Sequence, residues 1–176
     1  MTFDLEGIIV PVLAPLDEQE RFDPEAFKEI VDYLLDRRVN PIFVAGSVGE
    51  FYAMRLEEVK GLIQTAVQVV GGRAPVLAGT GAIATRDAIE LSRYAEEVGA
   101  VALSIITPFY VQPNEDELYH HYAAVAAAVK VPILAYTNPG RSGGLTLSPD
   151  LMNRLAEKYE NIVGIKDSSG SMSNLM

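Results

Sequence analysis

Six short apolar runs alternate with segments of helical periodicity along this chain, and that alternation restricts its possible folds. The runs cover residues 8–14, 41–45, 75–78, 100–106, 132–135 and 162–165. The runs carry no charge, are apolar almost throughout and show no in-and-out alternation, which is typical of strands buried on both faces of a parallel sheet. We therefore predict an α/β fold in which helices cover a parallel sheet.

Five helices are predicted between these strands, and they begin near Pro24, Met54, Thr85, Asn114 and Ser148. Asp23 has the character of an N-cap, and Pro24 suits the first position of a helix. The absence of a linker or a break in composition indicates one domain over residues 1–176. Two architectures fit this pattern, a doubly wound sheet and the first six units of an eight-unit barrel. The number of strands leaves both open.

Composition excludes several classes of function. The chain has 176 residues, a formal net charge of -10 and no cysteine. The negative charge argues against nucleic acids and anionic membrane surfaces as partners, and the lack of cysteine excludes disulfides and thiolate metal sites. No apolar run approaches the roughly 20 residues of a membrane helix, and the N-terminus lacks the pattern of a secretory signal. We predict a cytoplasmic protein without a membrane span.

Lys166 ends the last apolar run, and a polar loop closed by Gly170 follows it. A cationic side chain at the end of a buried strand is costly unless it has a function. A lysine amine is a nucleophile only in its neutral form, which apolar surroundings favour. This placement suggests a Schiff-base lysine. The alternative is a lysine that ends the strand and extends to solvent.

Other motifs give weaker signals. The stretch from Gly79 to Ala84 fits the dinucleotide pattern G-x-G-x-x-A, but the strand that follows it lacks the acidic residue expected to bind a ribose. His120 and His121 are neighbours on a predicted helix, so their side chains point about 100° apart and cannot share a metal ion. The chain lacks the G-x-x-x-x-G-K-[ST] loop of nucleotide-binding proteins. The Ser168-Ser169-Gly170 stretch lacks the first glycine of a serine-hydrolase elbow, and neither histidine lies in a loop after a strand to serve as its base.

Polar groups follow several of the predicted strands. Ser47 follows the second strand, Tyr110 the fourth and Tyr136 the fifth, and Lys166 ends the sixth. Together they supply an amine nucleophile, hydroxyl groups that relay protons, and a glycine-flanked turn whose amides can bind a carboxylate. A barrel would bring all of these groups to one face.

From about Ile8 to its last residue, the chain resembles the dihydrodipicolinate synthase/N-acetylneuraminate lyase family. The matching motifs are Gly46-Ser47-Val48-Gly49-Glu50, Ala78-Gly79-Thr80-Gly81-Ala82, Thr107-Pro108-Phe109-Tyr110, Tyr136-Thr137-Asn138-Pro139 and Gly164-Ile165-Lys166-Asp167-Ser168-Ser169. The resemblance implies a class I, pyruvate-dependent aldolase on a (β/α)8 TIM barrel. This chain carries about six of the eight β/α units, so we expect it to be truncated at its C-terminus.

The resemblance also implies a role for each matching residue. Lys166 would form the imine with pyruvate, and Tyr136 would be the general acid and base beside it. Ser47 would pass protons between Tyr136 and Tyr110, while the amides of Ser47 and Val48 would hold the pyruvate carboxylate. Val48 stands where the family usually has threonine, so one hydroxyl contact is lost.

Two further implications concern partners and substrates. Tyr110 would reach into the site of a neighbouring subunit, which implies a homodimer or a homotetramer. Arg141 matches an arginine that binds the carboxylate of the incoming aldehyde, which favours a synthase that joins pyruvate to an amino-aldehyde. The alternatives are a retro-aldol lyase acting on a 2-keto-3-deoxy sugar acid or a sialic acid, and a non-catalytic fragment that needs a partner chain to complete the barrel. The imine acts as the electron sink, so no metal or organic cofactor is expected.

Overall fold

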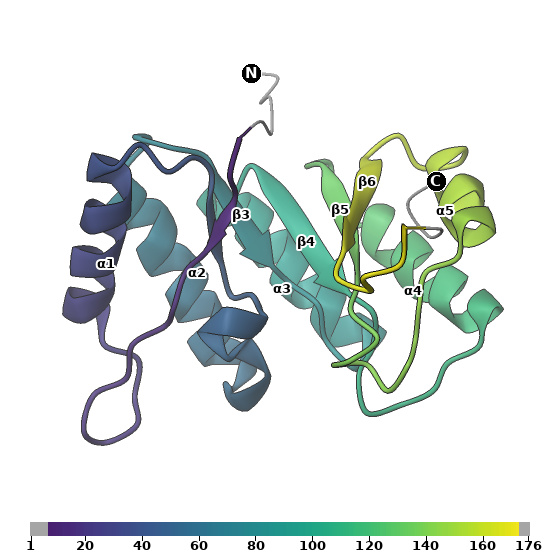
Figure 1. Ribbon diagram of the computed structural model, residues 1–176, viewed down its shortest axis with the longest axis horizontal. Helices are drawn as coiled ribbons and strands as arrows, with labels where there is room; N and C mark the ends of the chain where they lie inside the picture. Colours follow the sequence, from purple (N-terminus) through teal and green to yellow (C-terminus); the bar gives the residue numbers. More distant parts are fainter. Residues whose placement is uncertain (1–6, 173–176) are drawn as a thin grey trace. The chain divides into compact units, whose positions relative to one another are not determined.

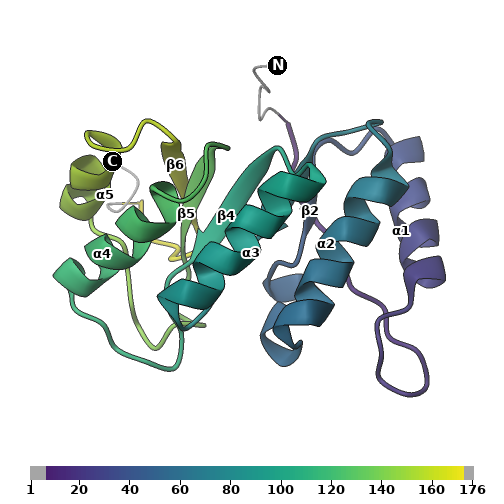
Figure 2. The ribbon, with the colours of Figure 1, turned by 180° about the vertical axis from the view of Figure 1, so that it is seen from behind.

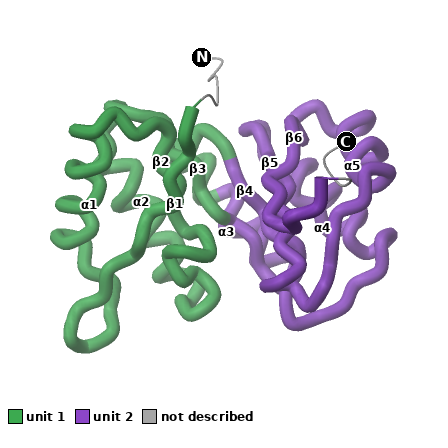
Figure 3. Tube along the Cα trace, viewed as in Figure 1, with its two compact units in different colours: residues 1–79, 94–102 green, residues 80–93, 103–176 purple. Residues whose placement is uncertain are grey.

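The computed structural model describes residues 7–172 and divides the chain into two compact units (Figure 3). The first unit comprises residues 1–79 and 94–102, and the second comprises residues 80–93 and 103–176. Each unit contains parallel strands joined by helices. The prediction of a single domain stays a prediction.

The first unit contains three parallel strands: β1 (Val10–Pro11), β2 (Ile42–Val44) and β3 (Val76–Gly79). In this unit β2 pairs with both β1 and β3. Helix α1 (Pro24–Asp36) packs on α2 (Leu56–Val70), which packs in turn on β2 and β3 (Figures 1 and 2). The largest fully buried side chains here are Phe27, Ile42, Leu62, Ile63 and Leu77.

The second unit repeats this arrangement with β4 (Ala102–Ile106), β5 (Ile133–Thr137) and β6 (Ile162–Asp167). Here β5 pairs in parallel with both β4 and β6. Helix α3 (Thr85–Val98) follows β3, α4 (Glu115–Ala126) follows β4, and α5 (Pro149–Ala156) packs on α4 and β6. The core contains Leu103, Ile105, Tyr122, Ile133, Leu147, Leu151 and Leu155. The predicted parallel α/β pattern is confirmed.

The helix starts follow the capping chemistry of the sequence. The Asp23 carboxylate accepts hydrogen bonds from the Glu25 and Ala26 amides at 3.0 and 3.1 Å, and Pro24 occupies the first position of α1, as predicted. The first strand is shorter than expected. Residues 8–14 were predicted as a strand, but only Val10 and Pro11 pair regularly, and a proline has no N–H group for a ladder.

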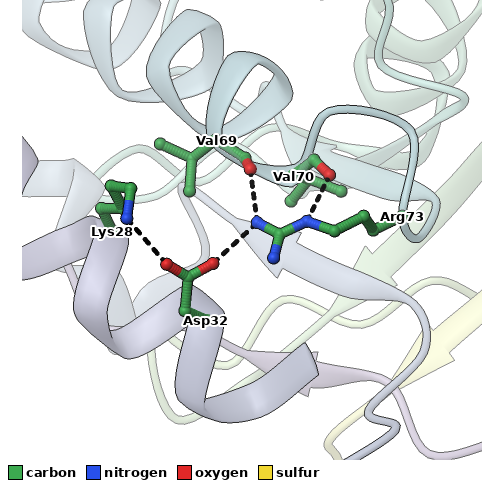
Figure 4. Close-up of polar contacts among 5 residues, drawn as sticks. All are labelled: Lys28, Asp32, Val69, Val70 and Arg73. Atoms are coloured by element: carbon green, nitrogen blue, oxygen red, sulfur yellow. Dashed lines mark hydrogen bonds and ion pairs between the residues drawn. The ribbon is translucent and has the colours of Figure 1, made fainter. Parts of the chain in front are cut away.

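Arg73 ties the C-terminal end of α2 to α1 (Figure 4). Its guanidinium donates to the Val69 and Val70 carbonyls at 2.7 and 3.1 Å and to the Asp32 carboxylate at 2.7 Å. Lys28 contacts the other oxygen of Asp32 at 2.9 Å. Hydrogen bonds from Lys28 and then Arg73 lower the pKa of Asp32. The guanidinium therefore adds hydrogen bonds to carbonyls in the last turn of α2, where the helix itself supplies few donors.

No helix within residues 7–172 is long and apolar enough to span a membrane. Within the same range, no group of three or more histidine, cysteine, aspartate or glutamate side chains is placed to hold a metal ion.

His121 in α4 is a buried ionisable group that is only 4% exposed. Its Nδ1 lies 3.0 Å from the Thr85 hydroxyl, and its Nε2 has no partner among the described residues. Burial lowers the pKa of His121 from 6.5 to about 4. The unfolded chain takes up a proton below its higher pKa of 6.5, whereas the folded chain does so only near 4. Stability should therefore fall as the pH drops from 6.5 to 4.

We predict that H121L removes much of this acid sensitivity. The histidine accounts for a loss of about 3 kcal/mol across that pH interval, from the difference between the two pKa values. The free energy of unfolding is measured by urea denaturation of the wild type and of H121L at several pH values between 7 and 4. The comparison uses only how steeply this free energy changes with pH, so a constant stability difference between the two proteins does not affect it. H120L is the matched control, since His120 is exposed on the same helix. Equal slopes in the wild type and H121L would contradict the assignment.

Candidate active site

Lys166 and Tyr136 stand opposite each other on the paired strands β5 and β6. The pairing is shifted by one residue near its start: Ile133 pairs with Ile162, but Leu134 pairs with Gly164. Val163 of β6 is therefore an extra residue that pairs with no residue of β5. Residues in register on parallel strands point to the same face, so the shift places Lys166 and Tyr136 on one face.

The two side chains are in direct contact. The Lys166 Nζ lies 3.1 Å from the centroid of the Tyr136 ring, over its face. Tyr136 is 5% exposed, whereas Lys166 is half-buried. A cation over an aromatic face is attracted to the ring, and more strongly where water is excluded. Both residues were expected at strand ends, but each strand continues one residue further, to Thr137 and Asp167.

The Tyr136 hydroxyl has an unusual environment. The Asn138 amide donates a hydrogen bond to this oxygen at 2.8 Å. Burial, the largest single influence, raises the pKa of Tyr136. Hydrogen bonds with Lys166, Ser168 and Asn138, together with the charge of Lys166, outweigh burial and lower the pKa from 10.0 to about 8. At neutral pH this phenol can therefore both give and accept a proton.

The polar loop after β6 is held by its own residues. The Ser168 amide donates to the Thr137 carbonyl at 2.9 Å, which continues the contact between the two strands beyond Lys166. The Asp167 carboxylate accepts hydrogen bonds from the amide and the hydroxyl of Ser169, both at 2.6 Å. These contacts fix the backbone directly after the lysine.

Arg141 lies exposed in the loop between β5 and α5. The Asn138 carbonyl accepts hydrogen bonds from the Arg141 amide at 2.9 Å, the Ser142 amide at 3.0 Å and the Ser142 hydroxyl at 2.9 Å. Ser142 is completely buried. The Gln112 side-chain amide donates a hydrogen bond to the Gly143 carbonyl at 2.8 Å. This bond joins the loop of Arg141 to the loop that carries Tyr110.

Ser47 and Val48 belong to the first unit. They begin a short 3-10 turn, Ser47–Gly49, directly after β2, and the Gly49 amide closes it on the Gly46 carbonyl at 3.0 Å. Val48 is 46% exposed. The turn presents an apolar side chain to solvent, where a threonine would present a hydroxyl.

The glycines of Gly79-Thr80-Gly81 are required by backbone packing. A Cβ atom on Gly79 would overlap the Ala45 carbonyl, and one on Gly81 would come within 2.9 Å of the Ile106 amide nitrogen. The Thr80 hydroxyl accepts a hydrogen bond from Ser92 at 2.8 Å. This stretch therefore has a packing reason for its glycines without any nucleotide.

Four of the six predicted site residues lie in the second unit, and of these Lys166 and Tyr136 contact each other. Tyr110 is 94% exposed and has a positive φ of 70°. Sequence reasoning assigned no function to Asn138 or Ser168. Asn138 had a usable signal, because side chains two residues apart on an extended chain point the same way, and it follows Tyr136 by two.

Comparisons with known proteins identify the family that the chain is similar to. The sequence model of the dihydrodipicolinate synthetase family matches residues 4–176. A 4-hydroxy-tetrahydrodipicolinate synthase from Mesorhizobium japonicum is 37% identical over 171 residues, which are 97% of this chain and 58% of that protein. The chain thus spans a little over half the length of the curated relatives it matches.

Solved structures share the fold. The dihydrodipicolinate synthase from Acinetobacter baumannii complexed with pyruvate is 37% identical, with a TM-score of 0.91 over 97% of this chain and 58% of that one. CdNal from Clostridium difficile in complex with mannosamine is 26% identical, with a TM-score of 0.94 over 98% of this chain and 59% of that one. These matches confirm the (β/α)8 barrel class, of which residues 7–172 supply six strands and five α-helices.

We predict that G143A disturbs the loop of Arg141 and that G140A does not. Gly143 has φ +64, and a Cβ atom there would overlap the Gln112 amide nitrogen, whereas one on Gly140 meets only the Asn138 side chain at 3.6 Å. The left-handed backbone alone costs about 1–2 kcal/mol for a residue with a Cβ atom. Trypsin cleavage after Arg141, followed by mass spectrometry, measures the effect. Cleavage should be faster in G143A, and equal rates in the two variants would contradict the prediction.

Proposed function

This chain belongs to the dihydrodipicolinate synthetase family, and from that membership we propose that it carries out pyruvate-dependent aldol chemistry through an imine on Lys166. The observation that carries the proposal is the contact between the Lys166 amine and the Tyr136 ring at 3.1 Å. An amine nucleophile beside a phenol that ionises near neutral pH is the pair that imine formation requires.

The steps follow from these two groups. The Lys166 amine adds to the C2 carbonyl of pyruvate and forms a carbinolamine. Loss of the C2 hydroxyl as water needs a proton donor, and Tyr136 supplies that proton. Removal of a methyl proton from the resulting imine gives an enamine, whose carbon attacks the aldehyde. Hydrolysis of the product imine regenerates the free amine. A tyrosine with a pKa of about 8 is suited to donate and accept in turn.

Several roles are carried over from the family to matching positions. Ser47 passes protons between Tyr136 and Tyr110, and the amides of Ser47 and Val48 hold the pyruvate carboxylate. Because Val48 lacks a hydroxyl, this carboxylate loses one hydrogen bond, which is worth about 1.5–3 kcal/mol when the acceptor is charged. Pyruvate affinity should be correspondingly weaker than in a threonine-containing relative.

We also propose that the protein works as a homodimer or a homotetramer. Tyr110 supports this proposal, because its aromatic ring is 94% exposed and so hardly packs against residues 7–172, while its backbone is held in a left-handed conformation. Val111 beside it is 40% exposed, which adds apolar surface for a second copy. The cytoplasmic location stays a prediction.

Reduction of an imine to a stable amine tests the catalytic proposal. The folded chain is incubated with pyruvate and borohydride, digested, and mapped by mass spectrometry. We expect one adduct on the peptide that contains Lys166, and none in K166R. K158R is the matched control, because Lys158 also lies near a tyrosine ring, at 5.9 Å from the Tyr159 centroid. Full labelling of K158R and none of K166R is the expected pattern.

A folded wild-type chain that forms no adduct would contradict the catalytic proposal. The chain would then be a fragment that needs a partner chain before any chemistry occurs. A mixture with such a chain would restore labelling of Lys166 in that case.

A synthase and a lyase differ in the second substrate. Arg141 favours a synthase, because its guanidinium can bind the carboxylate of an amino-aldehyde. The solved relative in complex with mannosamine favours the alternative, a lyase acting on a sialic acid or a 2-keto-3-deoxy sugar acid. We predict that R141A lowers the condensation rate with a carboxylated aldehyde about 10- to 100-fold, the equivalent of one charged hydrogen bond. Borohydride trapping with pyruvate alone should be unchanged.

Equal losses of trapping and condensation in R141A would show that this arginine has another role. R154A serves as control. Arg154 pairs with Glu115 and Asp116 on the surface of the same unit, so its removal should affect neither measurement.

A further inference from the structure

The phenol oxygen of Tyr136 is held by a side chain to which family membership gives no function. The Asn138 Nδ2 donates to this oxygen at 2.8 Å. Asn138 is itself fixed, because its carbonyl accepts two backbone hydrogen bonds, from Arg141 and Ser142, and a third bond from the Ser142 hydroxyl. The amide therefore approaches the phenol from an anchored turn and can hold the oxygen in one place.

We propose that Asn138 is a positioning residue for the acid–base group of this site: its amide fixes the Tyr136 oxygen and stabilises the tyrosine in its phenolate form. This inference rests on the proposed function, in which Tyr136 moves the protons of imine formation. A hydrogen bond donated to the charged form of an acid favours that form.

The other groups around Tyr136 act in the same direction or leave its charge alone. The Lys166 cation from β6 lies over the ring, and Ser168, from the loop after β6, hydrogen-bonds to the tyrosine side chain. From α4, Tyr122 donates its hydroxyl to the Ile105 carbonyl at 2.9 Å, and burial raises the pKa of that tyrosine, so it stays neutral. On β4, the residue in register with Tyr136 is Ile106, which carries no charge.

The bond from Asn138 has a chemical consequence for Lys166. An ammonium group cannot attack a carbonyl, so a proton must leave Nζ before the carbinolamine forms. The phenolate oxygen of Tyr136 accepts that proton, which gives a neutral amine and a neutral phenol. The same phenol then donates its proton to the departing hydroxyl. By stabilising the phenolate, Asn138 keeps Tyr136 in the form that accepts the proton from Lys166 Nζ.

The ionisation of Tyr136 tests the inference without any substrate. Tyrosine labelled with ¹³C at Cζ reports phenol ionisation by NMR, and Y136F assigns the signal among the 8 tyrosines. We expect N138L to raise the titration midpoint of Tyr136 by about one pH unit, because a donor to the phenolate is removed. N138D should raise it further, since a carboxylate can only accept and adds negative charge. N153L, at an exposed asparagine of α5, should leave the midpoint unchanged.

Two results would overturn the inference. An unchanged midpoint in N138L would show that the hydrogen bond does not affect ionisation, and a lowered midpoint would show that the amide oxygen accepts from the neutral phenol instead. Aspartate has the shape of asparagine, so N138D keeps the test available if N138L does not fold.

Borohydride trapping at several pH values separates this inference from the proposed function. We expect trapping in N138L to need a more alkaline pH than in the wild type, by the same interval as the NMR midpoint. Normal trapping in the wild type together with an unchanged midpoint in N138L would overturn the role of Asn138 alone. Absent trapping in the wild type would overturn the proposed function.

Discussion

Lys166 meets Tyr136 because β6 carries one more residue than β5 at the start of their pairing. With Ile133 opposite Ile162 and no shift, Tyr136 would stand opposite Ile165, and Lys166 would point to the other face of the sheet. The extra residue, Val163, absorbs this difference and is 54% exposed. Gly164 then fits against Leu134, where a Cβ atom would lie 3.4 Å from its side chain. A single backbone irregularity thus decides whether the amine and the phenol share a site.

Once the register is set, the electrostatics of the pair come from residues next to each strand end. Asn138 follows Tyr136 by two residues, and Ser168 follows Lys166 by two, so each strand supplies a hydrogen-bond donor to the same phenol. Burial alone would raise the pKa of Tyr136, yet these donors and the lysine charge bring it to about 8. The ionisation of the phenol is therefore a local property of two strand ends.

The sequence predicted the elements of the fold far better than their pairing. Continuous apolar runs indicated each strand, and Asp23 with Pro24 indicated the start of α1. The same continuity conceals register, because strands that are buried on both faces show no alternation from which a shift can be recognised. Val163 is one apolar residue among several, and nothing in its type distinguishes an unpaired position from a paired one. Sequence reasoning consequently placed Lys166 at the end of a strand, whereas the contact with Tyr136 depended on pairing.

The arrangement of the second unit separates two tasks. Lys166, Tyr136, Asn138 and Ser168 form a partly buried cluster in which a proton can move between amine and phenol. Arg141 lies outside that cluster on an exposed loop. Its backbone amide nevertheless donates to the Asn138 carbonyl, so both residues belong to one turn. Since a charge is best recognised by an accessible cation and imine chemistry is best done where water is limited, this separation suits a two-substrate reaction. Substitutions in the loop can then change the second substrate while the acid–base pair stays intact.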